Sequence, residues 1–173
     1  MKRLLLLLLL LTSAVPTTAN ETREIISETK NSLLITEKDV LTDSIEYRLA
    51  ILTKNSQPNS IGSQETSQLL IYCDEYGVNA YLPTNTYNGQ KNQNLKLRWN
   101  KDSPVVSNRW GINTSTGTSF GYKDAKAFLE KLGKKDRLLI MWETHSGISR
   151  FFIFDLIAAR KSILKHRSLC SGY

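Results

Sequence analysis

The chain has 173 residues, a formal net charge of +7 and two cysteines. This length suits one domain with a core of its own and leaves too little chain for two. The lysines and arginines are scattered among expected strands and are not gathered beside stacking aromatic residues, which argues against a nucleic-acid-binding protein. The excess positive charge favours contact with acidic proteins, cell-wall polymers or lipid headgroups.

Residues 1–19 have the order of a secretory signal peptide. A cationic start at Lys2 and Arg3 precedes an unbroken run of leucines over residues 4–11, and small and polar residues then lead to Ala19. The apolar run is shorter than the roughly 20 residues that span a bilayer, so we expect cleavage and not a retained anchor. The expected mature protein is a single exported domain over residues 20–173, periplasmic or secreted, with no transmembrane segment.

After the leader, the expected elements begin with a weak helical pattern over residues 21–32. Residues 44–52 then alternate apolar and polar side chains, which is the period of a half-buried strand. The segments 53–67 and 83–93 are rich in Asn, Ser, Gln and Gly and have no period. We expect both segments to be exposed loops within one domain.

Further strands are predicted in the middle of the chain. Apolar runs at 69–73 and 78–82 flank a four-residue turn that ends at Gly77, which predicts a hairpin. Residues 94–99 alternate Leu and Trp with Lys and Arg, and residues 109–112 have the pattern of a shorter strand. The 94–99 strand therefore has one apolar face and one basic face.

The C-terminal part is expected to hold two helices and a second hairpin. Apolar residues recur with helical spacing in residues 123–135 and again in residues 155–167, where Asp155 is the candidate N-cap. Between them, residues 137–143 and 149–155 flank a polar turn and form the strongest hairpin signal in the chain. The continuous apolar character of this pair predicts burial on both of its faces.

In an exported chain, two cysteines indicate first of all one disulfide. Cys73 ends an apolar strand and Cys170 follows the last helical pattern, so a bond between them would tie the terminal helix to the sheet. Two free, buried thiols are the alternative. Neither His145 nor His166 shows metal-site spacing to a cysteine, so we expect no metal and no cofactor.

Residues 143–146, Glu-Thr-His-Ser, place an acid, a base and two hydroxyl groups side by side. Catalytic groups have to converge in space, whereas neighbours on a hairpin point to alternate faces. The chain also lacks G-x-S-x-G, H-E-x-x-H and phosphate-binding glycine motifs. We therefore interpret this segment as a polar turn, assign no catalytic residue and expect a protein that is not an enzyme.

Two Arg-Trp pairs form the candidate partner-binding site. Arg98-Trp99 and Arg109-Trp110 fall on two expected strands, which we expect to be neighbours in the sheet. Arg and Trp are favoured at protein interfaces because they combine contact area with directional hydrogen-bond donors. The alternative is that both tryptophans belong to the core and the arginines form surface pairs.

A series of short motifs runs through the chain between residues 33 and 170. They are a Thr-Asp-Ser turn at 42–44, a strand ending at Cys73, Arg98-Trp99-Asn100, Trp110, Phe120, Phe154-Asp155-Leu156 and the terminal Cys170. In this order they resemble the periplasmic accessory proteins associated with type VI secretion, of the TagO or VasI type. The resemblance implies a role in an envelope or secretion assembly and implies no reaction mechanism.

Together these patterns predict one α+β domain, with an antiparallel sheet of about seven strands or a sandwich-like form of it, two packed helices and one disulfide. The expected function is a non-enzymatic, exported interaction module of a cell-envelope or secretion assembly, with a protein partner. Two alternatives stay open. One is an inhibitor or binder of a cell-wall enzyme that uses a protruding loop from 83–93 or 113–118, and the other is a small secreted hydrolase.

Overall fold

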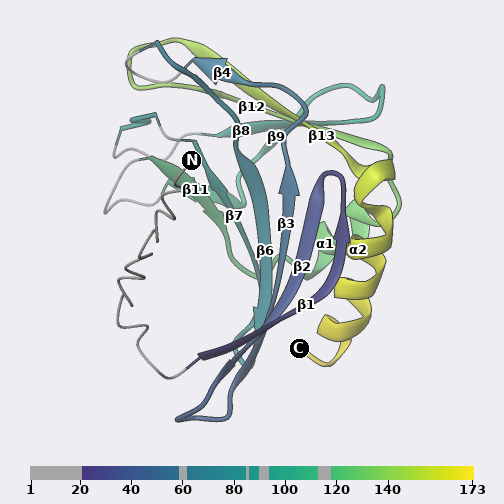
Figure 1. Cartoon of the computed structure of the whole chain (residues 1–173). Helices are drawn as coiled ribbons and strands as arrows, with labels where there is room; N and C mark the ends of the chain where they lie inside the picture. Colours follow the sequence, from purple (N-terminus) through teal and green to yellow (C-terminus); the bar gives the residue numbers. More distant parts are fainter. Residues whose placement is uncertain (1–20, 59–61, 85, 90–93, 113–117) are drawn as a thin grey trace, which may run out of the picture.

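The computed structural model describes residues 21–58, 62–84, 86–89, 94–112 and 118–173. Within these ranges the chain forms thirteen strands, two α-helices and a terminal 3-10 turn. The strands lie in antiparallel sheets of seven, four and two strands, and α2 runs beside the largest of them (Figure 1). The α+β fold with two helices and a seven-stranded antiparallel sheet is confirmed. The expected leader lies outside the described ranges, as does nearly all of the 113–118 loop.

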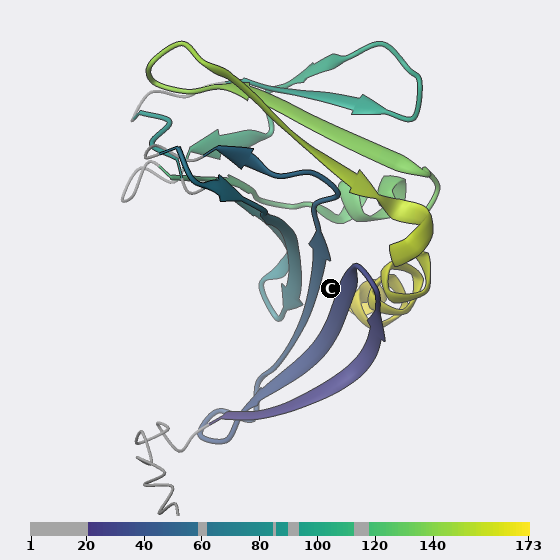
Figure 2. The ribbon, with the colours of Figure 1, turned by 45° about the horizontal axis from the view of Figure 1, so that its top comes forward.

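The largest sheet has the strand order β1-β2-β3-β6-β7-β11-β10. Its strands are Glu21–Thr29 (β1), Ser32–Asp39 (β2), Ile45–Leu52 (β3), Gln68–Asp74 (β6), Gly77–Pro83 (β7), Trp110–Ile112 (β10) and Ser119–Tyr122 (β11). The sheet curls, and α2 lies within the curl while the four-stranded sheet crosses the top of the molecule (Figure 2). We call the side that faces α2 the inner side and the opposite one the outer side.

The four-stranded sheet has the order β13-β12-β8-β9. Its strands are Leu95–Trp99 (β8), Val105–Ser107 (β9), Arg137–Glu143 (β12) and Ser149–Asp155 (β13). The expected loop 53–67 contains the two short strands of the third sheet, Gln57–Pro58 (β4) and Gln64–Glu65 (β5). Just before them, the Lys54 N–H donates to the Ile153 carbonyl oxygen at 2.7 Å, so the chain leaving β3 joins the edge of the second sheet.

The core fills the space between the two larger sheets. Alternate residues of β6 and β7 are buried on the inner side, among them Ile71, Cys73 and Leu82. From the four-stranded sheet, Trp142 meets Phe120 with ring centroids 6.1 Å apart. This period-two burial is typical of a strand that has one side against the core.

Both predicted C-terminal helices are present. The first, α1 (Lys126–Leu132), buries the apolar residues of its stripe, and the second, α2 (Leu156–Leu169), begins after Asp155. Asp155 Oδ1 accepts a hydrogen bond from the Ala158 N–H at 3.2 Å, which confirms the predicted N-cap. Over the described ranges, neither helix is long and apolar enough to cross a membrane.

The disulfide between Cys73 and Cys170 is confirmed, with Cα atoms 5.9 Å apart, and the alternative of two free thiols is wrong. It joins the inner side of β6 to the residue that follows α2. In the middle of the same helix, the buried hydroxyl group of Ser162 is hydrogen-bonded to that of Ser32 in β2 at 3.0 Å. The helix is therefore held to the sheet covalently at its end and by polar contacts along its length.

Two predictions of local structure are wrong. Residues 21–32 form strand β1, a turn and the start of β2 in place of a helix, and the pairing shifts in register between Ile25 and Ser27. This β-bulge interrupts the alternation by which a strand is recognised in sequence. The β12–β13 hairpin is buried on one face only, because outward residues such as Met141 and Phe151 are partly or largely exposed.

Candidate functional site

The two tryptophans of the candidate binding site lie in the core. Trp99 is 4% exposed and Trp110 is 3% exposed. Both rings pack against Phe128 of α1, with centroid distances of 5.6 and 5.5 Å. Neither ring reaches the surface, so the part of the alternative that places both tryptophans in the core is confirmed. The surface ion pairs that it gave to the arginines are not found among the described residues.

The two arginines are exposed, but they lie on different surfaces. Arg98 is on β8 of the four-stranded sheet, and Arg109 directly precedes β10 at the edge of the seven-stranded sheet. The expectation that these strands are neighbours is wrong, because the chain passes from one sheet to the other between them. The repeated Arg-Trp pattern thus places each tryptophan in the shared core and each arginine on a separate outer surface.

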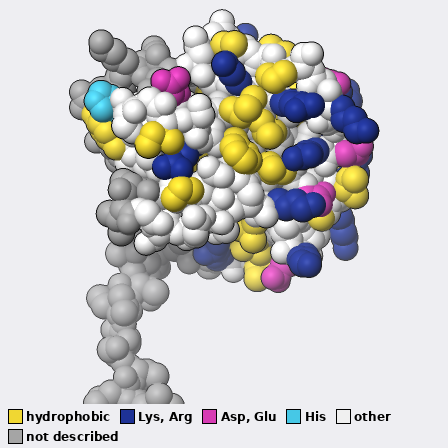
Figure 3. All heavy atoms as spheres, turned by 90° about the horizontal axis from the view of Figure 1, so that it is seen from above, with side chains coloured by type: hydrophobic (Ala, Val, Ile, Leu, Met, Phe, Trp, Pro, Cys, Tyr) yellow, Lys and Arg dark blue, Asp and Glu magenta, His cyan; other side chains and the backbone are white. Residues whose placement is uncertain are grey.

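The outer surface of the four-stranded sheet has a band of apolar side chains bordered by cations (Figure 3). The strand register aligns these residues in rows. Lys96 pairs with Met141, which pairs with Phe151, and Arg98 pairs with Leu139 in the next row. We call this surface the basic face; it consists of Lys96, Arg98, Val106, Arg137, Leu139, Met141, Phe151 and Ile153.

The cations of the basic face have no acidic partner. Within the described part of the chain, no carboxylate lies in salt-bridge range of Lys96, Arg98 or Arg137. Arg98 Nε donates instead to the Asp102 carbonyl oxygen at 3.0 Å, which fixes the guanidinium above the strand. The positive charge of this surface is therefore left available to a partner.

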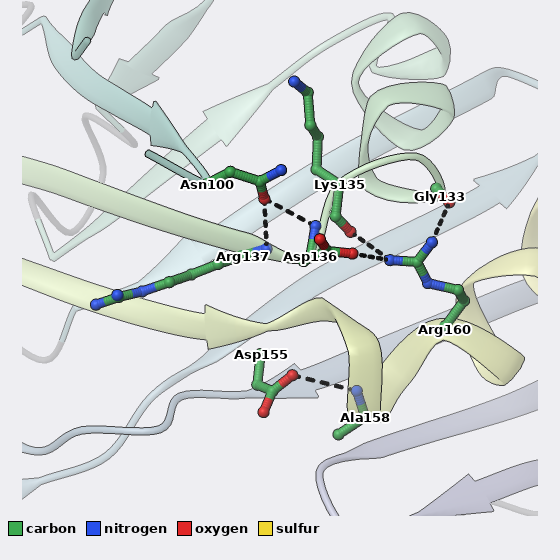
Figure 4. A network of polar contacts seen from close by, with 8 residues as sticks. All are labelled: Asn100, Gly133, Lys135, Asp136, Arg137, Asp155, Ala158 and Arg160. Carbon is green, nitrogen blue, oxygen red and sulfur yellow. Dashed lines mark hydrogen bonds and ion pairs between the residues drawn. The ribbon is translucent and has the colours of Figure 1, made fainter. Parts of the chain in front are cut away.

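The nearest carboxylates are engaged elsewhere (Figure 4). Asp136 binds Arg160 of α2 at 2.7 Å, and the Asp155 carboxylate caps the start of that helix. Asp102 is paired with Lys135 at 3.2 Å. Asp155 also pairs with Arg137 across β12 and β13, and the exposed Glu143 lies at the far end of β12 on the same face. Among the described residues, neither carboxylate forms a salt bridge with Lys96, Arg98 or Arg137.

Asn100, which the sequence indicated only as part of the Arg98-Trp99-Asn100 motif, holds the start of β12 in place. Asn100 follows β8 with a left-handed φ of 50°, and its Oδ1 accepts hydrogen bonds from the N–H groups of Asp136 and Arg137 at 2.9 and 3.0 Å. Asn tolerates this backbone conformation better than most residues. The contact fixes the start of β12, and the Arg137 side chain points away from the polar network (Figure 4).

The polar segment between β12 and β13 has the geometry of a turn. Thr144 Oγ1 accepts a hydrogen bond from the Ile148 N–H at 3.1 Å and lies 3.0 Å from Ser146 Oγ. The His145 ring lies against Tyr87, with centroids 5.5 Å apart. Among the described residues, His145 forms no hydrogen bond to Glu143 or Ser146, so these groups do not converge as an acid–base–nucleophile set would.

A buried Cys73–His166–Cys170 cluster was missed in the sequence. His166 and Cys170 are four residues apart at the end of α2 and so share one face of the helix; a ring nitrogen lies 3.5 Å from the Cys170 sulfur. The statement that neither histidine has suitable spacing to a cysteine is wrong for this pair. Because both sulfurs form the disulfide, neither is the thiolate that binds a metal.

His166 is fully buried, and its Nε2 lies 3.1 Å from the Tyr47 carbonyl oxygen. Burial lowers the pKa of His166 to about 4, while the contact with the Tyr47 carbonyl opposes this shift. The ring is therefore neutral at neutral pH. Its place between α2 and β3 makes it a structural contact of the inner side.

No protein-family model matches the chain, and no curated protein or solved structure matches it. The likeness to type VI accessory proteins therefore stays a sequence-based expectation.

Proposed function

We propose that this protein is a non-enzymatic, exported interaction module that docks its basic face on an acidic protein surface in the cell envelope. One observation carries the proposal: Lys96, Arg98 and Arg137 border partly exposed apolar side chains and have no carboxylate partner among the described residues. An apolar centre bordered by arginine is typical of protein interfaces, and unpaired positive charge steers a complementary surface into place.

A protein fits this face better than a nucleic acid or a lipid surface. Single-stranded nucleic acid binds to stacking aromatic side chains, and Phe151 is the one aromatic residue among those that define the basic face. Proteins that lie on membranes commonly insert an amphipathic helix, whereas this face is a flat sheet surface. Arg98 and Arg137 carry planar guanidinium groups, which bind carboxylates in a bidentate geometry.

Three features support the envelope as the setting. The order of residues 1–19 is that of a signal peptide. The disulfide between Cys73 and Cys170 is compatible with an oxidising compartment. The resemblance to type VI accessory proteins adds a secretion assembly as the candidate site of action, and the docking proposal does not depend on it.

A photo-crosslinking residue at Met141, in the middle of the basic face, tests the proposal in living cells. We expect one discrete protein adduct, whose partner is identified by mass spectrometry and then purified for direct titration. Charge reversal by Arg98→Glu together with Arg137→Glu should weaken that binding by about tenfold or more and reduce its salt dependence. The Tm should change little, because both side chains are exposed.

Two matched controls come from other surfaces of the chain. A crosslinker at Leu164, exposed on α2, should give no adduct with the same partner, and Arg109→Glu should leave the affinity unchanged. Equal adducts at Met141 and Leu164 would contradict the proposal, as would an unchanged affinity of the Arg98→Glu, Arg137→Glu double variant. Binding to anionic lipid vesicles with no protein adduct would also overturn it.

A further inference from the structure

The outer side of the seven-stranded sheet carries a separate groove of about 980 Å³. Its residues come from β6, β7, β10 and β11 and from the segments that flank them. We call it the tyrosine groove and define it by Tyr72, Asn79, Tyr81, Arg109, Gly111 and Gly121. Arg109, one of the four residues of the predicted site, belongs to this groove and not to the basic face.

Two glycines form part of the groove floor. Gly111 and Gly121 pair directly across β10 and β11, and Gly121 also pairs with Tyr81 of β7. Neither glycine has a left-handed φ, and a Cβ at either position would meet no atom of the described residues within 4 Å. Neither backbone conformation nor crowding within the chain therefore requires glycine at these positions. Glycine weakens a strand interior, and one reason to keep it there is close approach of another molecule to the backbone.

The neighbouring tyrosine does not cover this floor. Aromatic side chains in sheets often lie over a glycine of the adjacent strand. In that arrangement Tyr81 atoms would lie close to a Cβ at Gly121, and no Tyr81 atom lies within 4 Å of that position. The floor beside Tyr81 is thus bare backbone. Given the ordinary spacing between strands, it extends about 10 Å from Tyr81 to Gly111.

Polar side chains surround the floor. Tyr72 and Asn79 pair across β6 and β7, and Arg109 lies at the sheet edge. Within the described part of the chain, the Asn79 amide and the Arg109 guanidinium have no hydrogen-bond partner. Burial raises the pKa of Tyr72, with smaller contributions from Glu46 and Asp74, so its hydroxyl group stays protonated and is a donor at neutral pH.

We propose that the tyrosine groove binds a linear, uncharged saccharide chain. The weakly positive C–H face of a pyranose ring stacks on the negative face of an aromatic ring, for which Tyr81 is placed beside the floor. The flat ring fits a surface without side chains, and its hydroxyl groups match the amide, guanidinium and phenol groups around it.

Other ligand classes fit less well. The groove is lined by two carboxylates, Asp74 and Asp124, and by two cations, Arg109 and Lys123, so its lining has no net charge that would favour a charged polymer over a neutral one. An apolar ligand would cover the Asn79 and Arg109 side chains and leave them unpaired, which is unfavourable. This inference stands on residues of the seven-stranded sheet alone and is independent of the basic face.

Titration of the mature protein with three neutral tetrasaccharides tests the inference: the β-1,4-linked tetramers of N-acetylglucosamine and of glucose, and the α-1,4-linked tetramer of glucose. We expect at least one to bind, with NMR shifts confined to the groove. A Cβ at Gly121 meets no described atom within 4 Å, so Gly121→Val fills the floor and should weaken binding by about tenfold or more, as should Tyr81→Ala. Tyr81→Phe keeps the ring and should retain most of the affinity.

Ala50→Val is the matched control, because Ala50 lies in the same row of the outer side, two strands from Tyr81, and outside the groove. It should bind like the wild type, and so should the Arg98→Glu, Arg137→Glu double variant. Thermal melting of each variant establishes that it is folded. Absence of binding to all three tetrasaccharides would overturn the inference, as would equal affinity of Gly121→Val and the wild type.

Discussion

The two sides of the seven-stranded sheet are built from alternate residues of the same strands, yet one side is buried in the core and the other is exposed. On the inner side, Cys73 forms the disulfide and Ile71 is fully buried beneath the second sheet and the helices. On the outer side, Tyr72 stands between them in sequence and lines an open groove. A single step along β6 therefore separates a position that stabilises the fold from one that is free to bind.

This difference explains where each kind of variant should act. Contacts of the inner side join segments far apart in the chain, such as β3 and the end of α2, so their loss should lower the free energy of unfolding. The ion pairs of the outer side involve arginines that are about half exposed or more, and such pairs in water add little stability. Variants on the outer side should therefore change binding while the fold remains intact.

The largest effect is expected at the disulfide. Cys170→Ser should lower the free energy of unfolding by about 2–5 kcal/mol, because the bond closes a long loop and tethers the end of α2. Urea denaturation measures the loss. Hydrogen exchange should rise first in residues 155–170, while saccharide binding in the tyrosine groove of the folded protein should stay unchanged.

Cys73→Ser combined with Cys170→Ser is the control that removes both sulfurs and excludes effects of a free thiol. It should be about as stable as the single variant, and reduction of the wild type should give a similar loss. If the free energy of unfolding fell by well below 1 kcal/mol in all three cases, the disulfide would contribute little to the stability of the inner side, and the difference between the two sides would not hold.

The second effect concerns pH and His166. Burial lowers the pKa of this residue to about 4, against about 6.5 in an unfolded chain, so the unfolded state binds more protons between these values. The contribution of the neutral ring is complete above about pH 6.5 and is lost as the pH falls towards 4. We expect the free energy of unfolding to drop by about 3 kcal/mol between pH 7.5 and pH 4 from this group.

His166→Gln separates this effect from the titration of carboxylates, which both proteins share. The variant should be less stable at pH 7.5 and should have a shallower pH dependence over this interval. Parallel curves for the variant and the wild type would contradict the assignment. Chemical denaturation at four or five pH values is sufficient to decide.

The elements that the sequence predicts well are those whose signal is local. The apolar runs that predict strands at 69–73 and 137–143, the turn at Gly77 and the N-cap at Asp155 all depend on neighbouring residues, and these elements are confirmed. Strand β1 was missed because its bulge between Ile25 and Ser27 interrupts the alternation.

The candidate site was less predictable because it depends on which strands pair. The pattern at 94–99 correctly predicts a basic face that includes Arg98, but nothing local places Met141 and Phe151 beside it. The local pattern also does not show that Arg98 and Arg109 lie on different surfaces, because their separation results from the passage of the chain from one sheet to the other. The spacing of His166 and Cys170, in contrast, was visible in the sequence.

The smallest effect is expected from an ion pair on the outer side. Glu37 of β2 lies 2.8 Å from Arg48 and 3.5 Å from Arg23; its side chain is 12% exposed, whereas both arginine side chains are about half exposed or more. Glu37→Gln keeps the shape and removes the charge, so the free energy of unfolding should fall by less than about 1 kcal/mol. Because the two arginines are exposed to salt, their attraction to Glu37 is screened, and the difference from the wild type should shrink further in 1 M salt. A loss above about 2 kcal/mol that persists in high salt would show that the outer side also stabilises the fold, and the division between the two sides would then have to be abandoned.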